Sequence, residues 1–502
     1  MEESGLYVCN IPVESLNISP FVMVIFGGTG DLSQKKLLPA LFHTFVDHRF
    51  PHDSIILGVG TRPRSIEEYR EFAMESVRKN CREKPGEGCL ASFASHISYL
   101  PMDVTREEHY ELLHNFLKEH ESAKNGIIYY LAVQPEFSPV IIEKLNAAMI
   151  TARFPAGKVV MEKPFGWDRP SAEELNGIAL AAFREQNIFR IDHYLAKDTV
   201  QNIMFFRFSN SIFEPLWNRL YIDHVQITVA EEIGIGARGR FYEKTGVVRD
   251  IVQNHLLQLI ALTAMEPPAA FEADLIRNER VKVFRALRPM NDETIDRLTV
   301  RGQYGPGRIG GEAVRGYREE ELVDRGSATP TFFAGVFHID NWRWAGVPFY
   351  VRAGKRLASG ITRISIHFKQ PPLKLFSSTC DTLDPDVLVL TIQPEERISI
   401  HFGVKYPGKA NTIYPVTMDF NYDEAFHIRR HPPYEKILVD LMKGDLTLFA
   451  RQDEIEAAWS VVDPITKRWD EVKPGDFPDY EAGTWGPPEA AELIQRDGRM
   501  WL

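Results

Sequence analysis

Residues 21–30 read FVMVIFGGTG, and this stretch decides the fold of the first part of the chain. Its six apolar residues predict a buried strand, and the glycines predict a tight turn directly after it. Residues 31–45 then place apolar side chains at helical spacing. Glycines in a strand-to-helix turn let the backbone approach a pyrophosphate at the helix N-terminus. The spacing is GxxG rather than GxGxxG, so an ordinary tight turn stays open as an alternative.

Further strand patterns alternate with helical patterns through the first third of the chain. The strand patterns lie at 54–60, 126–133 and 158–161, and the helical patterns at 66–80, 106–120 and 137–149. This alternation predicts an α/β, Rossmann-like domain built on a parallel sheet. We place that nucleotide-binding domain at residues 16–190.

Beyond residue 200 the pattern changes to strand-rich segments with few helices between them. These segments are 221–230, 349–352, 361–368 and 387–392. Hairpin-length gaps favour antiparallel pairing, so residues 191–502 are predicted to form an α+β domain with a large, mainly antiparallel sheet. Residues 301–326 are predicted to form an exposed loop and residues 470–502 an irregular tail.

The composition excludes several classes of protein. The 502 residues carry 58 Lys and Arg against 69 Asp and Glu, a formal net charge of −11, so general binding to nucleic acid or to anionic membranes is not expected. No apolar run approaches the roughly 20 residues that span a bilayer. The N-terminus, MEESGLYVCNIPVE, does not resemble a signal peptide, so we expect a cytoplasmic protein. The four cysteines lack metal-ligand spacing, and no metal is expected.

Two polar stretches follow predicted strands of the first domain. Thr61-Arg62-Pro63-Arg64 lies where a carboxylate usually accepts a hydrogen bond from the ribose 2′-hydroxyl of NAD. An arginine at this place instead favours binding of the 2′-phosphate of NADP. The alternative interpretation is that these arginines are solvated surface residues with no role in cofactor binding. In Glu162-Lys163-Pro164-Phe165-Gly166, Lys163 could contact both cofactor and substrate, and Lys163–Pro164 is a candidate cis bond. A turn with a surface lysine is the alternative there.

The segment RIDHYLAK, residues 190–197, places a carboxylate, an imidazole, a phenol and an ammonium close together. Three of these groups can donate hydrogen bonds to a phosphate. Read alone, such a run is usually an exposed polar turn.

Residues 246–265, GVVRDIVQNHLLQLIALTAM, predict a helix with apolar residues on nearly every side, which should therefore be buried. Its polar residues need partners when buried, so a polar site in the core is expected. Read as an α-helix, it places Asp250, Asn254 and Gln258 on one face and His255 about 140° round from Asp250. A buried histidine is more often structural, but with an orienting carboxylate it forms a general base tuned near neutral pH.

Eight segments, in this order, resemble the glucose-6-phosphate dehydrogenase family. They are GGTGDLS, EKPFG, RIDHYLAK, NSIFEPLWNR, VVRDIVQNHLLQ, RGQY, WAGVPFYVRAGKRL and WGPPEA, and they cover the chain from about residue 20 to its end. The resemblance implies oxidation of glucose 6-phosphate at C1 to the δ-lactone, with hydride transfer to NADP, the first step of the oxidative pentose phosphate pathway. It also implies a homodimer or homotetramer formed through the large sheet.

The resemblance further implies roles for individual residues. His255 is the implied proton acceptor for the C1 hydroxyl, and Asp192 is the carboxylate that orients it. The implied substrate-binding residues are Lys163, His193, Tyr194, Lys197, Glu231, Asp250, Lys355 and Gln393. The implied cofactor-binding residues are Gly27, Gly28, Thr29, Gly30, Asp31, Leu32, Arg62 and Lys163.

The chain departs from the family pattern at several positions. Gly28 replaces the usual alanine, Gln134 a common proline, and Ala196 the usual glycine. Thr391 replaces a basic residue of a second, structural NADP site that some members have, so that site is not expected here.

A basic residue expected five positions after Lys355 is Gly360. Arg356 or Arg363 would have to take its place, or that substrate contact is missing.

Two other functions stay open. A related NADP-dependent sugar or polyol dehydrogenase would share the Rossmann domain and the EKP segment, but it would not need His193, Tyr194 and Lys197. A catalytically silent NADP-sensing protein would be free to lose His255 and Asp192, and both are present.

Overall fold

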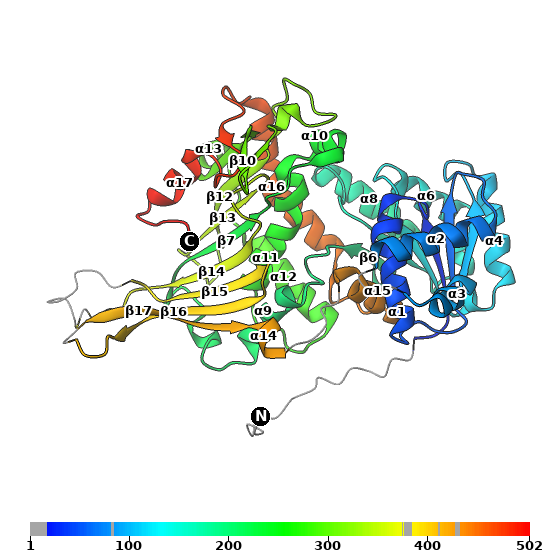
Figure 1. The fold of residues 1–502 in the computed structure, drawn as a ribbon, viewed down its shortest axis with the longest axis horizontal. Coiled ribbons are helices and arrows are strands. Elements are labelled where there is room, and N and C mark those ends of the chain that lie inside the picture. The colour runs from blue at the N-terminus through cyan, green and yellow to red at the C-terminus, as the bar shows by residue number, and fades with distance from the viewer. Residues whose placement is uncertain (1–17, 82–84, 374, 376–383, 410–411, 427–431) are drawn as a thin grey trace. The chain divides into compact units, whose positions relative to one another are not determined.

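The structure, a computed structural model, describes residues 18–81, 85–373, 375, 384–409, 412–426 and 432–502 (Figure 1). The N-terminal stretch read for a signal peptide lies outside the described residues, as do Cys9 and Cys380. Contacts divide the chain into two compact units. The first comprises Met1–Phe165, Glu174–His193 and His431–Ala450, and the second comprises Gly166–Glu173, Tyr194–Arg430 and Arg451–Leu502.

The predicted division between residues 190 and 191 stays a prediction for the domains. The two units differ from it chiefly because residues 431–450, far along the chain, belong to the first unit.

The first unit contains the parallel sheet that the sequence predicts. Its strands lie in the order β3-β2-β1-β4-β5-β6-β18, and all neighbouring pairs are parallel except β18 with β6. The strands are β1 (Val22–Phe26), β2 (Ile55–Gly60), β3 (Ile97–Pro101), β4 (Ile127–Leu131), β5 (Lys158–Met161), β6 (Ile188–Ile191) and β18 (Phe449–Ala450). The order 3-2-1-4-5-6 is that of a dinucleotide-binding Rossmann sheet, which confirms the predicted fold class.

Helices connect these strands. They are η1 (Ser33–Leu37), α1 (Leu38–Val46), α2 (Ile66–Asn80), α3 (Glu87–Ser95), α4 (Glu108–Glu119), α5 (Ser122–Asn125), α6 (Phe137–Ala147), α7 (Ile150–Arg153), η2 (Glu185–Asn187) and α15 (Pro433–Lys443), with α8 (Arg169–Ala182) belonging partly to each unit. Strands β1, β4 and β5 are almost fully buried, as expected for strands covered on both faces.

The second unit is built on an eight-stranded sheet in the order β17-β16-β15-β14-β7-β13-β12-β8 (Figure 1). The strands are β7 (Ile222–Ala230), β8 (Thr299–Gly302), β12 (Phe332–His338), β13 (Pro348–Gly354), β14 (Thr362–Phe368), β15 (Val387–Gln393), β16 (Arg397–Lys405) and β17 (Ile413–Asn421). Every neighbouring pair is antiparallel except β7 with β13, so the prediction of a mainly antiparallel sheet is confirmed.

The helices of the second unit include the buried helical segment predicted from residues 246–265. They are α9 (Asp198–Phe208), η3 (Glu214–Leu216), η4 (Gly236–Arg238), α10 (Gly239–Val247), η5 (Val248–Leu256), α11 (Leu257–Ala264), α12 (Ala273–Ala286), α13 (Asp292–Leu298), η6 (Tyr317–Glu319), α14 (Tyr422–Phe426), α16 (Gln452–Glu471) and α17 (Pro488–Gln495). Segment η5 packs on β7 and β13, so it forms part of the core.

Two segments are more ordered than the sequence predicts. Residues 301–326 contain the β10–β11 hairpin (Gly307–Ile309 and Glu312–Val314), and Tyr304 and Tyr317 are buried in the core. The expected exposed loop is therefore wrong there, because aromatic side chains anchor it.

The expected irregular tail also contains helix α17 and the short strand β19 (Tyr480–Glu481), which pairs with β9 (Tyr304–Gly305). The guanidinium of Arg352 lies 4.6 Å from the ring centres of both Trp485 and Trp501. These contacts pack the tail against the sheet. The sequence does not predict them, because the residues involved show no regular apolar spacing.

Candidate active site

The glycine turn after β1 is held by main-chain hydrogen bonds. The amides of Gly27 and Gly28 donate to the carbonyl oxygen of Val59, at 3.0 and 2.9 Å. Gly27 has a φ of 82°, and a Cβ on it would lie 2.2 Å from the carbonyl oxygen of Ala132. This position therefore requires glycine.

The structure also explains why Gly28 replaces the usual alanine. A Cβ on Gly28 would lie 2.8 Å from the Cα of Gly58 and from the phenolic oxygen of Tyr69. Tyr69 is buried and donates a hydrogen bond of 3.0 Å to the carbonyl oxygen of Gly28. The turn thus presents bare backbone just before η1, a cradle that fits the pyrophosphate of a dinucleotide.

The remaining predicted cofactor residues lie at the same edge of the first unit. Asp31 is exposed and pairs with Lys35 at 2.8 Å, so it lies on the surface of the turn. Arg62 follows β2 and is exposed, and its carbonyl oxygen accepts a hydrogen bond of 2.7 Å from Tyr99. Arg64 instead packs its guanidinium 4.7 Å from the ring centre of Phe72. Of the two arginines, Arg62 is therefore the better candidate for a 2′-phosphate.

Strands β5 and β6 are neighbours in the sheet, and their C-terminal ends carry the next predicted residues. Lys163 follows β5, and the Lys163–Pro164 bond is cis, as predicted. Asp192 and His193 directly follow β6, and Asp192 is buried. The carboxyl ends of parallel strands are where ligands bind in such sheets.

A cluster that sequence reasoning missed supports this edge. The buried Tyr130 donates a hydrogen bond of 2.6 Å to the carboxyl oxygen Oε1 of Glu162, and Tyr434 donates one of 3.2 Å to the same atom. Burial raises the pKa of the Glu162 carboxyl. Tyr434 lies some 270 residues away on α15, and nothing in its surrounding sequence marks it as part of the site.

In the second unit, four of the predicted residues come together. The rings of Tyr194 and His255 stack with their centres 4.1 Å apart. The Lys197 ammonium lies 3.9 Å from the centre of the Tyr194 ring and donates a hydrogen bond of 2.5 Å to the side-chain oxygen of Gln393. The imidazole of His255, the phenol of Tyr194 and the ammonium of Lys197 thus lie in one polar cluster.

A second group of predicted residues surrounds Lys355, at the end of β13. Its ammonium forms ion pairs with Glu231, at the end of β7, and with Asp250 of η5, the latter at 3.3 Å. Lys355 is 1% exposed and Asp250 is 7% exposed. Because β7 and β13 are parallel neighbours, their C-terminal ends bring Glu231 and Lys355 together.

The helical segment that carries Asp250 and His255 is a π-helix over Val248–Leu256. Its hydrogen bonds join residues five apart in the chain, so Asp250 and His255 lie closer to one face than they would in an α-helix. The predicted separation of 140° between Asp250 and His255 is therefore wrong, since it assumes an α-helix. Short π-helical segments occur frequently at functional sites.

Neighbouring contacts argue against both of the arginines proposed to replace the missing basic residue at Gly360. The Tyr194 hydroxyl lies 3.4 Å from the hydroxyl of Thr362, a contact that the sequence analysis missed. Successive side chains of a strand point to opposite faces, so Arg363 points away from the face that holds Tyr194. Arg356 pairs with Glu320 at 3.6 Å, so it too is engaged elsewhere.

A Rossmann unit with a glycine cradle, together with a buried polar site rich in charged and hydrogen-bonding groups, is typical of a nucleotide-dependent dehydrogenase. Two family models match the chain: "Glucose-6-phosphate dehydrogenase, NAD binding domain" over residues 24–202, and "Glucose-6-phosphate dehydrogenase, C-terminal domain" over residues 204–502. The chain therefore belongs to the glucose-6-phosphate dehydrogenase family and is an oxidoreductase that acts on a CH–OH group.

Individual relatives agree with this assignment. The chain is 42% identical over 493 residues to glucose-6-phosphate 1-dehydrogenase of Rhizobium meliloti (strain 1021), covering 98% of each chain. It is 44% identical over 483 residues to that of Aggregatibacter actinomycetemcomitans, covering 95% of this chain and 96% of the relative.

Solved structures also agree with this family assignment. A glucose-6-phosphate dehydrogenase in complex with its substrate glucose 6-phosphate superposes with a TM-score of 0.86 at 32% identity, covering 96% of this chain and 99% of that one. The enzyme from Mycobacterium avium superposes with a TM-score of 0.82 at 34% identity, with the same coverage.

Proposed function

We propose that this chain oxidises glucose 6-phosphate at C1 to 6-phospho-D-glucono-1,5-lactone, with NADP as the hydride acceptor, the first step of the oxidative pentose phosphate pathway. The observation that carries the proposal is the cluster of Tyr194, Lys197, His255 and Gln393 in one polar site of the second unit. The test is a steady-state assay of the reduced cofactor with glucose 6-phosphate or glucose, and with NADP or NAD.

In this mechanism His255 accepts the proton of the C1 hydroxyl while the hydride leaves C1. Without a base, loss of the hydride would leave a costly cation at C1, so proton and hydride acceptors must flank one carbon. Asp192 is proposed to orient the imidazole and to stabilise its charged form. Bound NADP supplies the hydride acceptor.

The residues around the site are proposed to bind the sugar. His193, Tyr194 and Lys197 hold the phosphate, whose binding energy positions the distant C1. Lys163, Glu231, Asp250, Lys355 and Gln393 hold the hydroxyl groups. The ion pairs of Lys355 with Glu231 and Asp250 support this proposal, because they fix acceptors and a donor in one orientation.

Replacing Lys197 with alanine is expected to lower kcat/KM for glucose 6-phosphate by roughly 10- to 150-fold, because a charge-assisted hydrogen bond to a dianion is lost. The value for unphosphorylated glucose should hardly change. Steady-state kinetics with both sugars measure the difference, and Lys282→Ala, at an exposed position of α12, is the matched control. Equal losses for the two sugars would move Lys197 out of the phosphate site.

NADP is proposed to bind at the glycine cradle with its 2′-phosphate at Arg62. A guanidinium can pair with a phosphate in a forked geometry, and no Asp or Glu occurs from Ser54 through Ser65 to repel the phosphate. Arg62→Ala should raise the KM for NADP by roughly 5- to 150-fold and barely change that for NAD. Arg64→Ala, at the arginine packed on Phe72, is the control. Equal losses for both nucleotides would assign Arg62 a structural role.

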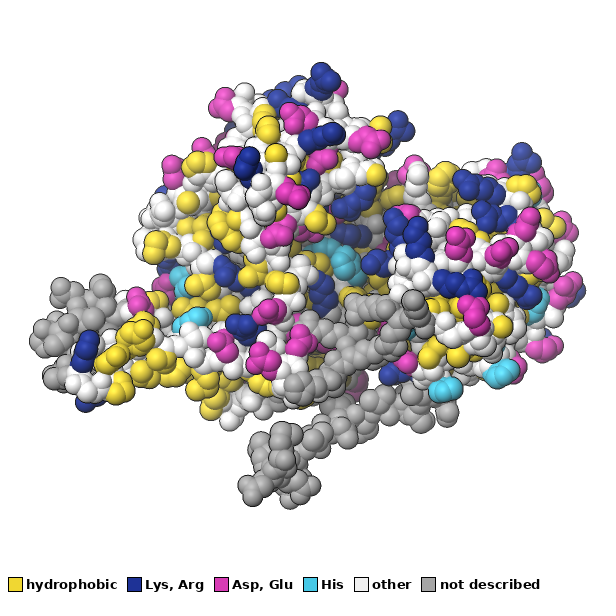
Figure 2. Space-filling view, viewed as in Figure 1, with side chains coloured by type: hydrophobic (Ala, Val, Ile, Leu, Met, Phe, Trp, Pro, Cys, Tyr) yellow, Lys and Arg dark blue, Asp and Glu magenta, His cyan; other side chains and the backbone are white. Residues whose placement is uncertain are grey.

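We also propose a cytoplasmic homodimer or homotetramer. Cys89 is an exposed free thiol, which suits a reducing compartment. Within the described residues, no helix is both long and apolar enough to cross a membrane. Apolar side chains gather over β16 and β17 in Figure 2, where Tyr414, Met418 and Phe420 are exposed. Such a patch on an edge strand favours a second copy of the chain as its cover, and analytical ultracentrifugation measures the assembly.

A further inference from the structure

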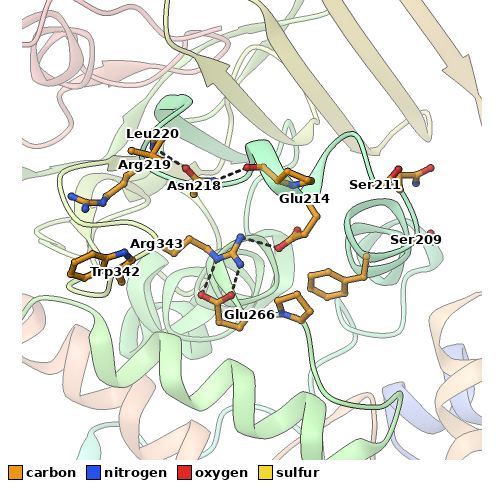
Figure 3. A pocket seen from close by; sticks show the side chains of 13 residues that line it. Ser209, Ser211, Glu214, Asn218, Arg219, Leu220, Glu266, Trp342 and Arg343 are labelled. Carbon is orange, nitrogen blue, oxygen red and sulfur yellow. Dashed lines mark hydrogen bonds and ion pairs between the residues drawn. The ribbon is translucent and has the colours of Figure 1, made fainter.

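A cavity of about 800 Å³ opens in the second unit beside the end of α9 (Figure 3). It is lined by residues of NSIFEPLWNR, the segment 210–219, together with residues just after α11 and the pair Trp342-Arg343. None of the proposed catalytic or substrate-binding residues lines it. Its volume is typical of a site for a small organic molecule.

The polar floor of the cavity is electrically balanced. Arg343 donates to both carboxyl oxygens of Glu266 and, at 2.9 Å, to Glu214 (Figure 3). Behind it the buried Arg207 pairs with Glu214 at 3.1 Å and donates to the carbonyl oxygens of residues 262, 263 and 265, which end α11. Two arginines thus offset two glutamates, and the floor offers a ligand no unpaired charge.

The rim of the cavity, in contrast, is positive. The Arg219 guanidinium lies 5.2 Å from the centre of the Trp342 ring, and within the described part of the chain it has no acidic partner. Lys369 adds a second cation, because its ammonium donates a hydrogen bond of 2.6 Å to the carbonyl oxygen of Arg219. An anionic group of a ligand could therefore pair with Arg219 without displacing a protein carboxylate.

The walls are apolar and unusually open to water. Trp342 is 87% exposed and Leu220 is 69% exposed, and Phe208, Pro215 and Pro267 continue the apolar lining. When a flat apolar group covers an exposed indole, apolar surface is removed from water, and this favours binding.

We propose that this cavity binds a small organic monoanion with a flat apolar body, such as an aromatic carboxylate. The body would cover Trp342 and Leu220, and the carboxylate would pair with Arg219. A cationic ligand is disfavoured, because Glu214 and Glu266 are already neutralised by arginines and the rim repels it. The proposal is independent of the sugar site, since the two share no residue.

The test uses the full chain and three probes with the same body and different charge: 2-naphthoate, 2-naphthylmethanol and 2-naphthylmethylammonium. Isothermal titration calorimetry at low ionic strength should show naphthoate binding the tightest. Arg219→Ala should weaken naphthoate about tenfold and leave the alcohol unchanged. Trp342→Ala should weaken both, and Arg308→Ala, at an exposed arginine of the β10–β11 hairpin, should change neither.

Saturating glucose 6-phosphate should leave naphthoate binding unchanged, and the variants should keep wild-type turnover and thermal stability. Displacement of naphthoate by glucose 6-phosphate would overturn the proposal, because it would place the probe in the sugar site. Tighter binding of the ammonium, equal binding of all three probes, or an Arg219→Ala variant that binds naphthoate like wild type would each overturn it as well.

Discussion

Replacing His255 with asparagine is expected to lower kcat by about 10²- to 10⁴-fold while KM for glucose 6-phosphate stays near its wild-type value. Asparagine keeps a polar side chain in the buried site but cannot accept the C1 proton at neutral pH. Stopped-flow or steady-state assays of the reduced cofactor give kcat, and equilibrium binding of glucose 6-phosphate gives its Kd. A variant with near-normal kcat and weak binding would assign His255 to ground-state contacts.

The Asp192→Asn variant and the double variant His255→Asn with Asp192→Asn test whether Asp192 is the partner of His255. If the Asp192 carboxylate acts only through the imidazole, its loss should also lower kcat, and the double variant should be little worse than His255→Asn alone. Additive losses in the double-mutant cycle would contradict the proposed pair.

Much of the fold could be predicted from local patterns. Strands β1, β2, β4 and β5 are short apolar runs next to glycine or charged residues, and β7, β13, β14 and β15 were located to within a few residues. Strands β12, β16 and β17 were missed, although β12 is almost wholly buried. Pairing with distant strands stabilises them, and one sequence carries no direct signal of that pairing.

The site was predictable where its residues are neighbours in sequence and unpredictable where the fold joins distant segments. The segment of residues 190–197 shows its polar groups together, whereas nothing in the sequence around Lys355 points to Glu231, beside which β13 places it. Tyr434 and Thr362 each contribute to the site through a single hydroxyl group, and no pattern of residue spacing in the sequence identifies them. The π-helix of η5 likewise changes which side chains share a face, and periodicity alone does not distinguish it from an α-helix.

Replacing Lys355 with methionine is expected to have the largest effect on stability. Methionine fills a similar volume but removes the cation between Glu231 and Asp250, which leaves two carboxylates close together in a largely buried place. Removing one partner of a buried ion pair costs about 3 kcal/mol in the free energy of unfolding. Thermal or urea unfolding near pH 7 measures the loss, and KM for glucose 6-phosphate should rise in the same variant because a proposed hydroxyl contact is gone.

The pH dependence and a second substitution separate this cause from a simple packing defect. The two carboxylates of the Lys355→Met variant repel each other when both are charged, so protonating one at lower pH should recover part of the lost stability. The double variant Lys355→Met with Glu231→Gln leaves a single buried charge and should be more stable near pH 7 than Lys355→Met alone. A stability loss that is independent of pH and unchanged by Glu231→Gln would show that Lys355 acts through its packing, and that its charge does not hold Glu231 and Asp250 together.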